Sequence, residues 1–151
     1  MSNNEERSLP RATVATIVES GGKFLLVKEE VDGKTVYNQP AGHIEQGESI
    51  ADAAIRETYE ETGWVVQPLR VAGISVYHAP NNISYIRSTL IAEPLQQDTT
   101  ILDDGILEAL WLSYEEILLI EDQLRSPVVL KVIEDYRLGI SYPLDLIQEH
   151  R

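Results

Sequence analysis

Three glutamates lie within five residues of the segment RETYEETG: Glu57, Glu60 and Glu61. Their spacing of three and four residues would place the carboxylates on one face of a helix. Like charges at this spacing cost roughly 0.2–0.5 kcal/mol per pair, and the helix dipole disfavours anions near the C-terminus. Mg²⁺ would relieve the repulsion, because it binds carboxylate oxygens and keeps waters for a phosphate substrate. The alternative is a solvated acidic face, with Arg56 as its compensating cation.

The segment NQPAGHIEQGES, residues 38–49, precedes these glutamates and is predicted to be a loop. A loop of about twelve residues is long for a compact domain, which is typical of a functional segment. Gly42 and Gly47 would allow a sharp turn or a close approach to a ligand. Ala41 could then offer its backbone carbonyl to a metal. Glu48 lies at the junction with the helix, where the dipole favours an anion.

The elements that must position these residues alternate irregularly along the chain. A helix is predicted between Ser49, an N-cap whose partner Asp52 resembles a capping box, and Gly63 as its C-terminal glycine. Two more helices are predicted over 114–120 and 126–139. The expected strand segments are 12–19, 23–31, 35–37, 64–79, 83–93 and 106–112. This order predicts an α/β fold, with a mixed sheet carrying helices on its faces.

Composition narrows the class of protein. Acidic residues outnumber basic ones 25 to 12, which gives a net charge of -13. A nucleic-acid polymer or an anionic membrane is therefore disfavoured as a partner, because phosphate backbones attract basic surfaces. A small phosphorylated ligand remains compatible, since a bound divalent cation reverses the local sign of charge. The chain has no cysteine, which excludes a disulfide framework and a thiol nucleophile.

The length of 151 residues with 43% hydrophobic residues indicates one domain with a buried core. We expect residues 1–10 to form a flexible N-terminal arm and residues 11–151 a single domain. The arm is polar and lacks the apolar region of a secretion signal. The sequence also lacks a run of the about 18 apolar residues that a membrane span needs. A soluble, cytoplasmic protein is expected.

The segment GHIEQGESIADAAIRETYEETGW, residues 42–64, resembles the Nudix box. That pattern is Gly, five residues, Glu, seven residues, Arg-Glu, a hydrophobic residue, any residue, Glu-Glu, any residue, Gly and a hydrophobic residue. The matching positions are Gly42, Glu48, Arg56, Glu57, Glu60, Glu61 and Gly63. Thr58 replaces the usual aliphatic residue, and Trp64 is an aromatic variant of the last position. The resemblance implies the Nudix fold, an α/β/α sandwich with a mixed sheet.

The resemblance also implies a reaction, the hydrolysis of a nucleoside diphosphate linked to another moiety or of a related pyrophosphate. Its cofactor would be Mg²⁺, with Mn²⁺ as a substitute, because a densely anionic pyrophosphate needs charge screening. The implied metal ligands are the carboxylates of Glu57, Glu60 and Glu61 and the Ala41 carbonyl. Glu57 or another acid would activate water, and Arg56 would orient Glu48 or Glu57. By family habit the protein would be a monomer or a homodimer.

Segments outside the box resemble the NudJ-type phosphatase branch of this family. They are YNQPAGHIE (37–45), YIRSTLIAE (85–93), LWLSYEEI (110–117), LRSP (124–127) and YPLDLI (142–147). This resemblance implies phosphate release from nucleoside tri- and diphosphates, or from hydroxymethylpyrimidine pyrophosphate, a thiamine-pathway intermediate. Two alternatives remain within the family: a hydrolase of ADP-ribose, dinucleoside polyphosphates or oxidised nucleotides, and a catalytically silent nucleotide sensor. A purely structural Ca²⁺ or Mg²⁺ site is a third.

Four residues outside the acidic cluster are candidates for substrate binding. Tyr37 would stack on a base or pyrimidine ring, although core or rim packing explains it equally well, and Asn38 is its neighbour. His43 lies beside Gly42, where it would contact phosphate or water, or make a structural hydrogen bond. Arg87 would bind phosphate, and its alternative is a surface position on a strand.

A second acid outside the box is a further candidate for the general base. The loop before the strand 106–112 contains Asp103 and Asp104, and Glu108 lies in the strand itself. Gly105 occupies the position where the commonest family variant has a glutamate. We therefore rank Asp104 and Glu108 together as candidate catalytic acids.

Overall fold

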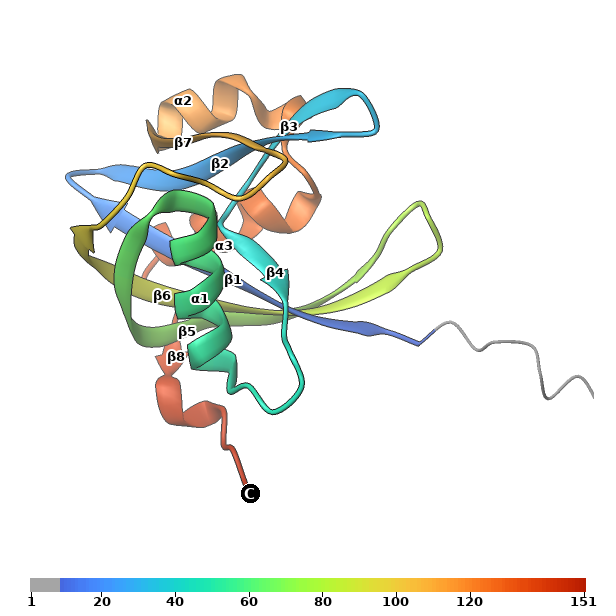
Figure 1. Cartoon of the computed structure of the whole chain (residues 1–151), viewed down its shortest axis with the longest axis vertical. Coiled ribbons are helices and arrows are strands. Elements are labelled where there is room, and N and C mark those ends of the chain that lie inside the picture. The colour runs from blue at the N-terminus through green and yellow to red at the C-terminus, as the bar shows by residue number, and fades with distance from the viewer. Residues whose placement is uncertain (1–8) are drawn as a thin grey trace, which may run out of the picture.

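The computed structural model describes residues 9–151, which form a mixed β-sheet with helices on its two faces (Figure 1). The strands are β1 (Arg11–Ser20), β2 (Lys23–Val31), β3 (Lys34–Asn38), β4 (Ala41–His43), β5 (Trp64–His78), β6 (Ser84–Gln97), β7 (Ile106–Ser113) and β8 (Tyr142–Pro143). The helices are α1 (Ile50–Thr62), α2 (Tyr114–Leu119) and α3 (Pro127–Arg137), with short 3-10 turns η1 (Glu121–Gln123) and η2 (Leu144–Leu146). The predicted α/β/α architecture is confirmed.

The sheet is built around β1, which pairs in parallel with β6 and antiparallel with β4 and β2. The main strand order is β3-β2-β1-β6-β5-β8, while β7 pairs with β2 and β4 with β1. Residues 14–18 of β1 are all buried, because both faces of this strand are covered. This explains the nearly continuous run of Val, Thr and Ile in its sequence.

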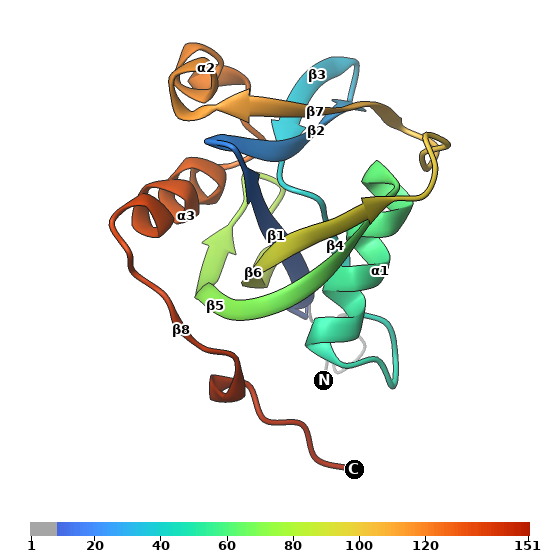
Figure 2. The ribbon, with the colours of Figure 1, turned by 90° about the vertical axis from the view of Figure 1, so that its left-hand side faces the viewer.

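The helices α1 and α3 lie on opposite faces of the sheet, as Figure 2 shows from the side. On one face α1 packs through Ala53 and Ala54 against Val14, Val71 and Leu90. The small alanine side chains let this helix lie close to the strands. The other face carries the larger cluster, whose buried members are Ile17, Phe24, Leu26, Ala72, Ile91, Ile117, Val132 and Ile133. The helix that carries the glutamates is thereby fixed to the centre of the sheet.

Several predicted boundaries are confirmed and others need correction. The turn at Gly21 and Gly22 separates β1 from β2, and Ser49 and Gly63 cap α1 as expected. The predicted loop over residues 38–49 is wrong in part, because β4 forms inside it by pairing with β1. The strand predicted over 83–93 extends to Gln97, and β8 was not predicted. The predicted flexible arm falls mostly on residues 1–8, outside the described residues; Leu9 and Pro10 are exposed and precede β1.

The N-caps of α1 and α2 differ in geometry. Ser49 accepts a hydrogen bond from the N–H of Asp52 at 3.0 Å, without the reciprocal side-chain contact of a capping box. The full capping box belongs to α2, where Ser113 and Glu116 cap each other. Within residues 9–151, no helix is both long enough and apolar enough to cross a membrane.

Candidate active site

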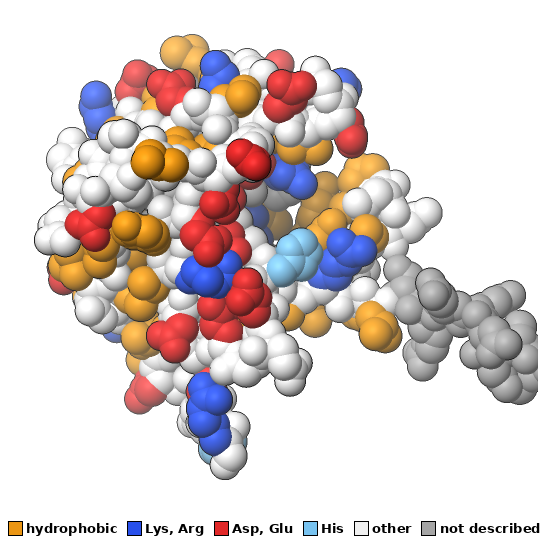
Figure 3. Space-filling view, in the orientation of Figure 1, with side chains coloured by type: hydrophobic (Ala, Val, Ile, Leu, Met, Phe, Trp, Pro, Cys, Tyr) orange, Lys and Arg blue, Asp and Glu red, His pale blue; other side chains and the backbone are white. Residues whose placement is uncertain are grey.

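The acidic residues of α1 border a hollow on the surface of the protein (Figure 3). In this space-filling view, acidic side chains form a strip over α1, and the hollow opens beside it. The inner face of the helix includes Ala54, Thr58 and Thr62, which are buried. Thr58 donates to the hydroxyl of Thr16 at 3.0 Å. The hydroxyl of this unusual threonine in the box therefore has a hydrogen-bond partner on β1, so Thr58 leaves no unsatisfied hydroxyl in the core.

Arg56 joins the acids of the loop to those of the helix. Its Nε donates to Glu48 Oε2 at 2.7 Å, and its Nη1 donates to Glu57 Oε1 at 2.7 Å and to Glu60 Oε2 at 3.2 Å. Its Nη2 donates to the carbonyl of His43 at 3.1 Å. The hydrogen bond from Arg56 holds the pKa of Glu48 below its usual value. Arg56 was predicted to orient Glu48 or Glu57, and its guanidinium contacts both; its role in catalysis stays a prediction.

Glu57 lies against the backbone of the loop at Gly42. A β-carbon added at Gly42 would overlap the carboxylate of Glu57, so only glycine leaves room for this side chain. Burial raises the pKa of Glu57 despite the opposing hydrogen bond from Arg56, and the charges of Glu60 and Asp103 raise it further. A raised carboxyl pKa improves a general base, because its proton affinity is closer to that needed at neutral pH.

Substitution of Gly42 by alanine should therefore affect activity more than stability. The added methyl group meets the end of a flexible side chain, so Glu57 moves while the backbone stays in place. We expect kcat/KM to fall by about 10-fold or more, since displacing a reacting group by about 1 Å can cost 100-fold. Unfolding free energy should change by less than about 1 kcal/mol. Steady-state kinetics and thermal unfolding of the variant measure the two effects.

Gly63→Ala is the contrasting control, because Gly63 has a φ of 76° and caps α1. A β-carbon at this position would overlap the backbone carbonyl of Thr99, which cannot rotate away. We expect a loss of about 1–3 kcal/mol in unfolding free energy. If Gly42→Ala destabilised the protein as much as Gly63→Ala while retaining its activity, the close approach to Glu57 would have no functional role.

Glu61 is the most buried of the α1 carboxylates, and it connects the helix to β4. Its side chain accepts a hydrogen bond from the N–H of Ala41 at 2.9 Å. Burial raises the pKa of Glu61 to about 8, and the nearby charges of Glu29, Glu57 and Asp103 add to the shift. Metal-free protein must therefore keep this group protonated near neutral pH or accept a buried, mutually repelling charge.

This burial predicts a pH dependence of stability in metal-free buffer. A carboxyl whose folded pKa is about 8, above its ordinary 4.5, makes the folded state bind more protons than the unfolded state. Stability should then be highest below pH 4.5, as far as this group is concerned, and should fall as pH rises to about 8. Glu61→Gln removes the titration, so its melting temperature should exceed that of the unmodified protein at pH 8 and match it near pH 5. Thermal scans in EDTA across this range test the prediction. A constant difference across the range would contradict it.

Residues of other elements surround these acids. Glu29 of β2 raises the pKa of Glu61, and its Oε2 accepts from Arg125 Nη1 at 2.8 Å. The charge of Asp103 raises the pKa of both Glu57 and Glu61. The backbone N–H of Asp103 donates to the Glu60 carbonyl at 3.0 Å. Of the two acids ranked together from the sequence, Asp104 lies exposed in a turn and Glu108 exposed on β7. The structure thus brings Asp103 close to the helix acids, and the catalytic roles of the other two stay predictions.

The four residues predicted to bind substrate occupy two different environments. Tyr37 is half-buried and His43 exposed. Arg87 and Asn38 are buried together: Arg87 Nη1 and Nη2 each donate to Asn38 Oδ1 at 3.3 Å. The surface position considered for Arg87 is therefore incorrect. Their roles toward a substrate stay predictions.

Gln39, which was not singled out from the sequence, completes this buried network. Its Oε1 accepts from Arg87 Nη2 at 2.6 Å, and its Nε2 donates to the carbonyl of Val129 on α3 at 2.9 Å. Asn38, Gln39 and Arg87 thus tie the start of the loop to the sheet and to α3. The available signal for Gln39 was a pair of amide side chains followed by Pro-Ala-Gly. Hydrogen-bond partners this distant in the sequence cannot be identified without the fold.

The carboxylate oxygens beside the hollow are of the type that a hard divalent cation prefers as ligands. Glu57, Glu60 and Glu61 offer only oxygen atoms, which Mg²⁺ and Mn²⁺ prefer, and their charges exceed what Arg56 alone balances. Within residues 9–151, no three acidic or histidine side chains are gathered into a preformed metal cage. Arg56 bridges Glu57 and Glu60 instead. A cation would therefore be held by few carboxylates and by waters, and the Ala41 carbonyl remains a predicted ligand.

The fold and the acidic helix define a known class of hydrolase. The family profile described as NUDIX domain matches residues 8–132. This range includes every element from β1 to α2 and η1 and the first half of α3. The chain belongs to the Nudix family. It is therefore a hydrolase that acts on phosphorus-containing acid anhydrides, and members of this family generally use divalent metal ions.

Relatives extend the similarity along most of the chain. Phosphatase NudJ of Escherichia coli strain K12 is 40% identical over 139 residues, which cover 91% of this chain and 90% of that protein. A NUDIX hydrolase from Nitrosomonas europaea has 41% identity and a TM-score of 0.91, covering 94% of this chain and 98% of that one. An ADP-ribose pyrophosphatase from Streptococcus suis shares the fold alone, at 15% identity with a TM-score of 0.65 over 85% of this chain and 92% of that chain.

Proposed function

We propose that the protein is a phosphatase that releases orthophosphate from nucleoside tri- and diphosphates or from hydroxymethylpyrimidine pyrophosphate, with Mg²⁺ as cofactor and Mn²⁺ as a substitute. The observation that carries this proposal is the 40% identity with Phosphatase NudJ across 91% of the chain. Retention of every acid of the Nudix box supports an active enzyme over a silent nucleotide sensor.

The helix acids and Arg56 would share the work of binding and proton transfer. Glu57, Glu60 and Glu61 would hold the cation with the Ala41 carbonyl, and Mg²⁺ when bound would screen the pyrophosphate and polarise a phosphoryl oxygen. Glu57 would accept the proton of the attacking water, since its carboxylate lies against Gly42 and is held by Arg56. Arg56 and Glu48 would hold the carboxylate of Glu57 in place through their hydrogen bonds.

Residues around the hollow would complete the site. Asp103 joins Asp104 and Glu108 as a candidate for a second base, on account of its electrostatic influence on Glu57 and Glu61. Substrate contacts are assigned to Tyr37, Asn38, His43 and Arg87. Because Asn38 and Arg87 are buried and bonded to each other, they would bind a phosphate only at the floor of the site.

The decisive experiment measures which product is released. Purified protein is incubated with nucleoside tri- and diphosphates, hydroxymethylpyrimidine pyrophosphate, ADP-ribose and a dinucleoside polyphosphate, in Mg²⁺, in Mn²⁺ and in EDTA. Orthophosphate is expected from the first three classes, with no turnover in EDTA. Release of pyrophosphate or of two monophosphates instead would identify the alternative pyrophosphatase activity. Nucleotide binding without any turnover would identify a sensor.

A further inference from the structure

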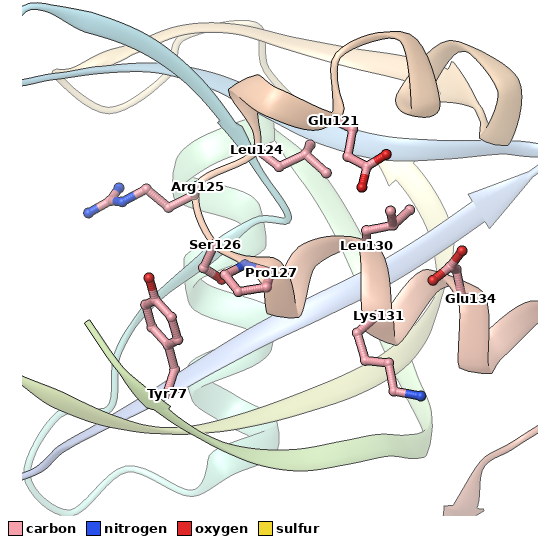
Figure 4. A pocket seen from close by; sticks show the side chains of 9 residues that line it. All are labelled: Tyr77, Glu121, Leu124, Arg125, Ser126, Pro127, Leu130, Lys131 and Glu134. Atoms are coloured by element: carbon pink, nitrogen blue, oxygen red, sulfur yellow. The ribbon is translucent and has the colours of Figure 1, made fainter. Parts of the chain in front are cut away.

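A second hollow lies between the end of β5 and the segment that joins η1 to α3. Its volume is about 410 Å³, and Figure 4 shows the side chains that line it. Leu124, Pro127 and Leu130 form apolar walls. Arg125 and Lys131 provide cationic groups, and Glu121 and Glu134 provide acidic groups at the end of the cleft away from Arg125. This volume is in the range of small-molecule sites, which combine mainly apolar walls with a few polar groups.

The cleft is connected to the predicted catalytic acids through Arg125. The Nη1 of Arg125 donates to Glu29 Oε2 at 2.8 Å, and its N–H donates to the Tyr37 carbonyl at 2.7 Å. Glu29 in turn lies close enough to Glu61 to raise its pKa. Arg125 therefore stands between the acids of α1 and the cleft, with its backbone and side chain both anchored.

Arg87 is a buried cation close to Arg125, with the acidic groups of Glu29 and Glu61 also near it. Arg87 is buried and hydrogen-bonded to neutral amides, and its Nε has no hydrogen-bond partner among the described residues. Burial and then the charge of Arg125 lower the pKa of Arg87 to about 10. An anion on Arg125 would reduce the repulsion between the two guanidinium groups.

The sheet presents an aromatic ring to the same cleft. Ser75 pairs with Arg87 and Tyr77 pairs with Tyr85 across β5 and β6, so Tyr77 and Arg87 share one face of the sheet. Figure 4 shows the Tyr77 ring directed toward Ser126 and Pro127, with Arg125 on the same side. A planar ring would fit between the phenol and the apolar wall of α3, since aromatic rings favour stacked or edge contacts.

We propose that this cleft binds the organic end of the substrate, with a planar heterocycle against Tyr77 and the phosphate that stays attached to it on Arg125. This assignment rests on the proposed function and extends it to substrate selection. The terminal phosphate would then extend toward Glu57 and Glu61, with Arg125 at the boundary. Arg125 and Tyr77 are thus specificity-determining residues for substrates that carry a ring.

The test measures binding of the organic product in the absence of metal. Cytidine and adenosine 5′-monophosphates carry a ring and one phosphate, whereas ribose 5-phosphate lacks the ring. Calorimetry should show tighter binding of the monophosphates. Tyr77→Leu should reduce their affinity by about 3–10-fold with little effect on ribose 5-phosphate. Arg125→Gln should weaken all three by about 10-fold or more, and Arg125→Lys should restore part of the loss.

Two controls make the outcome specific. Tyr142→Leu removes an exposed tyrosine from β8 and should change no affinity. In the unmodified protein, chemical-shift changes caused by cytidine 5′-monophosphate should centre on the amides of Tyr77 and Arg125, a result independent of any variant's folding. Shifts centred elsewhere, or equal affinity for the ringed and ringless phosphates, would overturn the assignment.

The result is separable from the proposed function. If the enzyme releases orthophosphate and Tyr77→Leu binds monophosphates as tightly as the unmodified protein, the cleft assignment fails while the proposed function stands. If no substrate yields orthophosphate but the monophosphates bind in the cleft, the proposed phosphatase activity fails and the binding site stands.

Discussion

Glu57→Gln is expected to lower kcat/KM by about 10²–10⁴-fold while the protein remains folded. The amide keeps the shape of the side chain beside Gly42 but can neither accept a proton from water nor carry charge toward a cation. Stability should change by less than about 1 kcal/mol, because burial already penalises the charged form of Glu57. Orthophosphate release per folded molecule, together with thermal unfolding in EDTA, measures both quantities.

Glu115→Gln on α2 provides the matched control, since it replaces an exposed helix glutamate outside the acidic strip. Its activity should equal that of the unmodified enzyme. The opposite pattern for Glu57→Gln, a lower melting temperature with unchanged turnover per folded molecule, would mean that the helix acids hold a purely structural cation.

Arg56→Met is expected to reduce both stability and activity. The guanidinium binds Glu48, Glu57 and Glu60 at once, and its side chain and those of Glu48 and Glu57 are only 23%, 14% and 14% exposed. Loss of the shared cation leaves these carboxylates repelling each other. We expect a cost of about 1–3 kcal/mol, below the ~3–5 kcal/mol of a fully buried ion pair because solvent screens part of the charge. Urea unfolding measures the loss.

Arg56→Lys distinguishes charge from geometry. Lysine keeps the positive charge but cannot make the forked contacts to two carboxylates, so stability should recover partly while kcat/KM stays at least about 10-fold low. Lys131→Met, which breaks an exposed pair with Asp135, should change stability by less than about 1 kcal/mol. A fully active, stable Arg56→Lys variant would show that the forked contacts to Glu48 and Glu57 are dispensable.

The acidic helix was predictable because its signals are local. A helix cap at Ser49, a C-terminal glycine at Gly63 and the spacing of the glutamates all act within a few turns of one helix. The same window contains the complete Nudix box. The class of enzyme therefore followed from the resemblance of this short segment to the Nudix box, while the composition only narrowed the possible partners.

The environment of that helix depended on contacts between distant segments. β4 forms only because residues 41–43 pair with β1. Arg87 is buried against hydrogen-bond partners that lie 48 and 49 residues away in the sequence. Arg125 reaches Glu29 across 96 residues. No local pattern encodes such pairings, since loop closure and burial are properties of the whole chain.

The sequence by itself determined the acidic helix, its caps, the alternation of strands and helices, and the family of the enzyme. Only the tertiary structure decided which acids share Arg56, that Asp103 lies near them, and that Arg87 is buried against Asn38 and Gln39. The physical reason is the sequence distance over which each property is set. Side-chain chemistry and helix spacing depend on neighbouring residues. Burial, pKa values and the shape of a binding site arise only when distant segments pack together and exclude water.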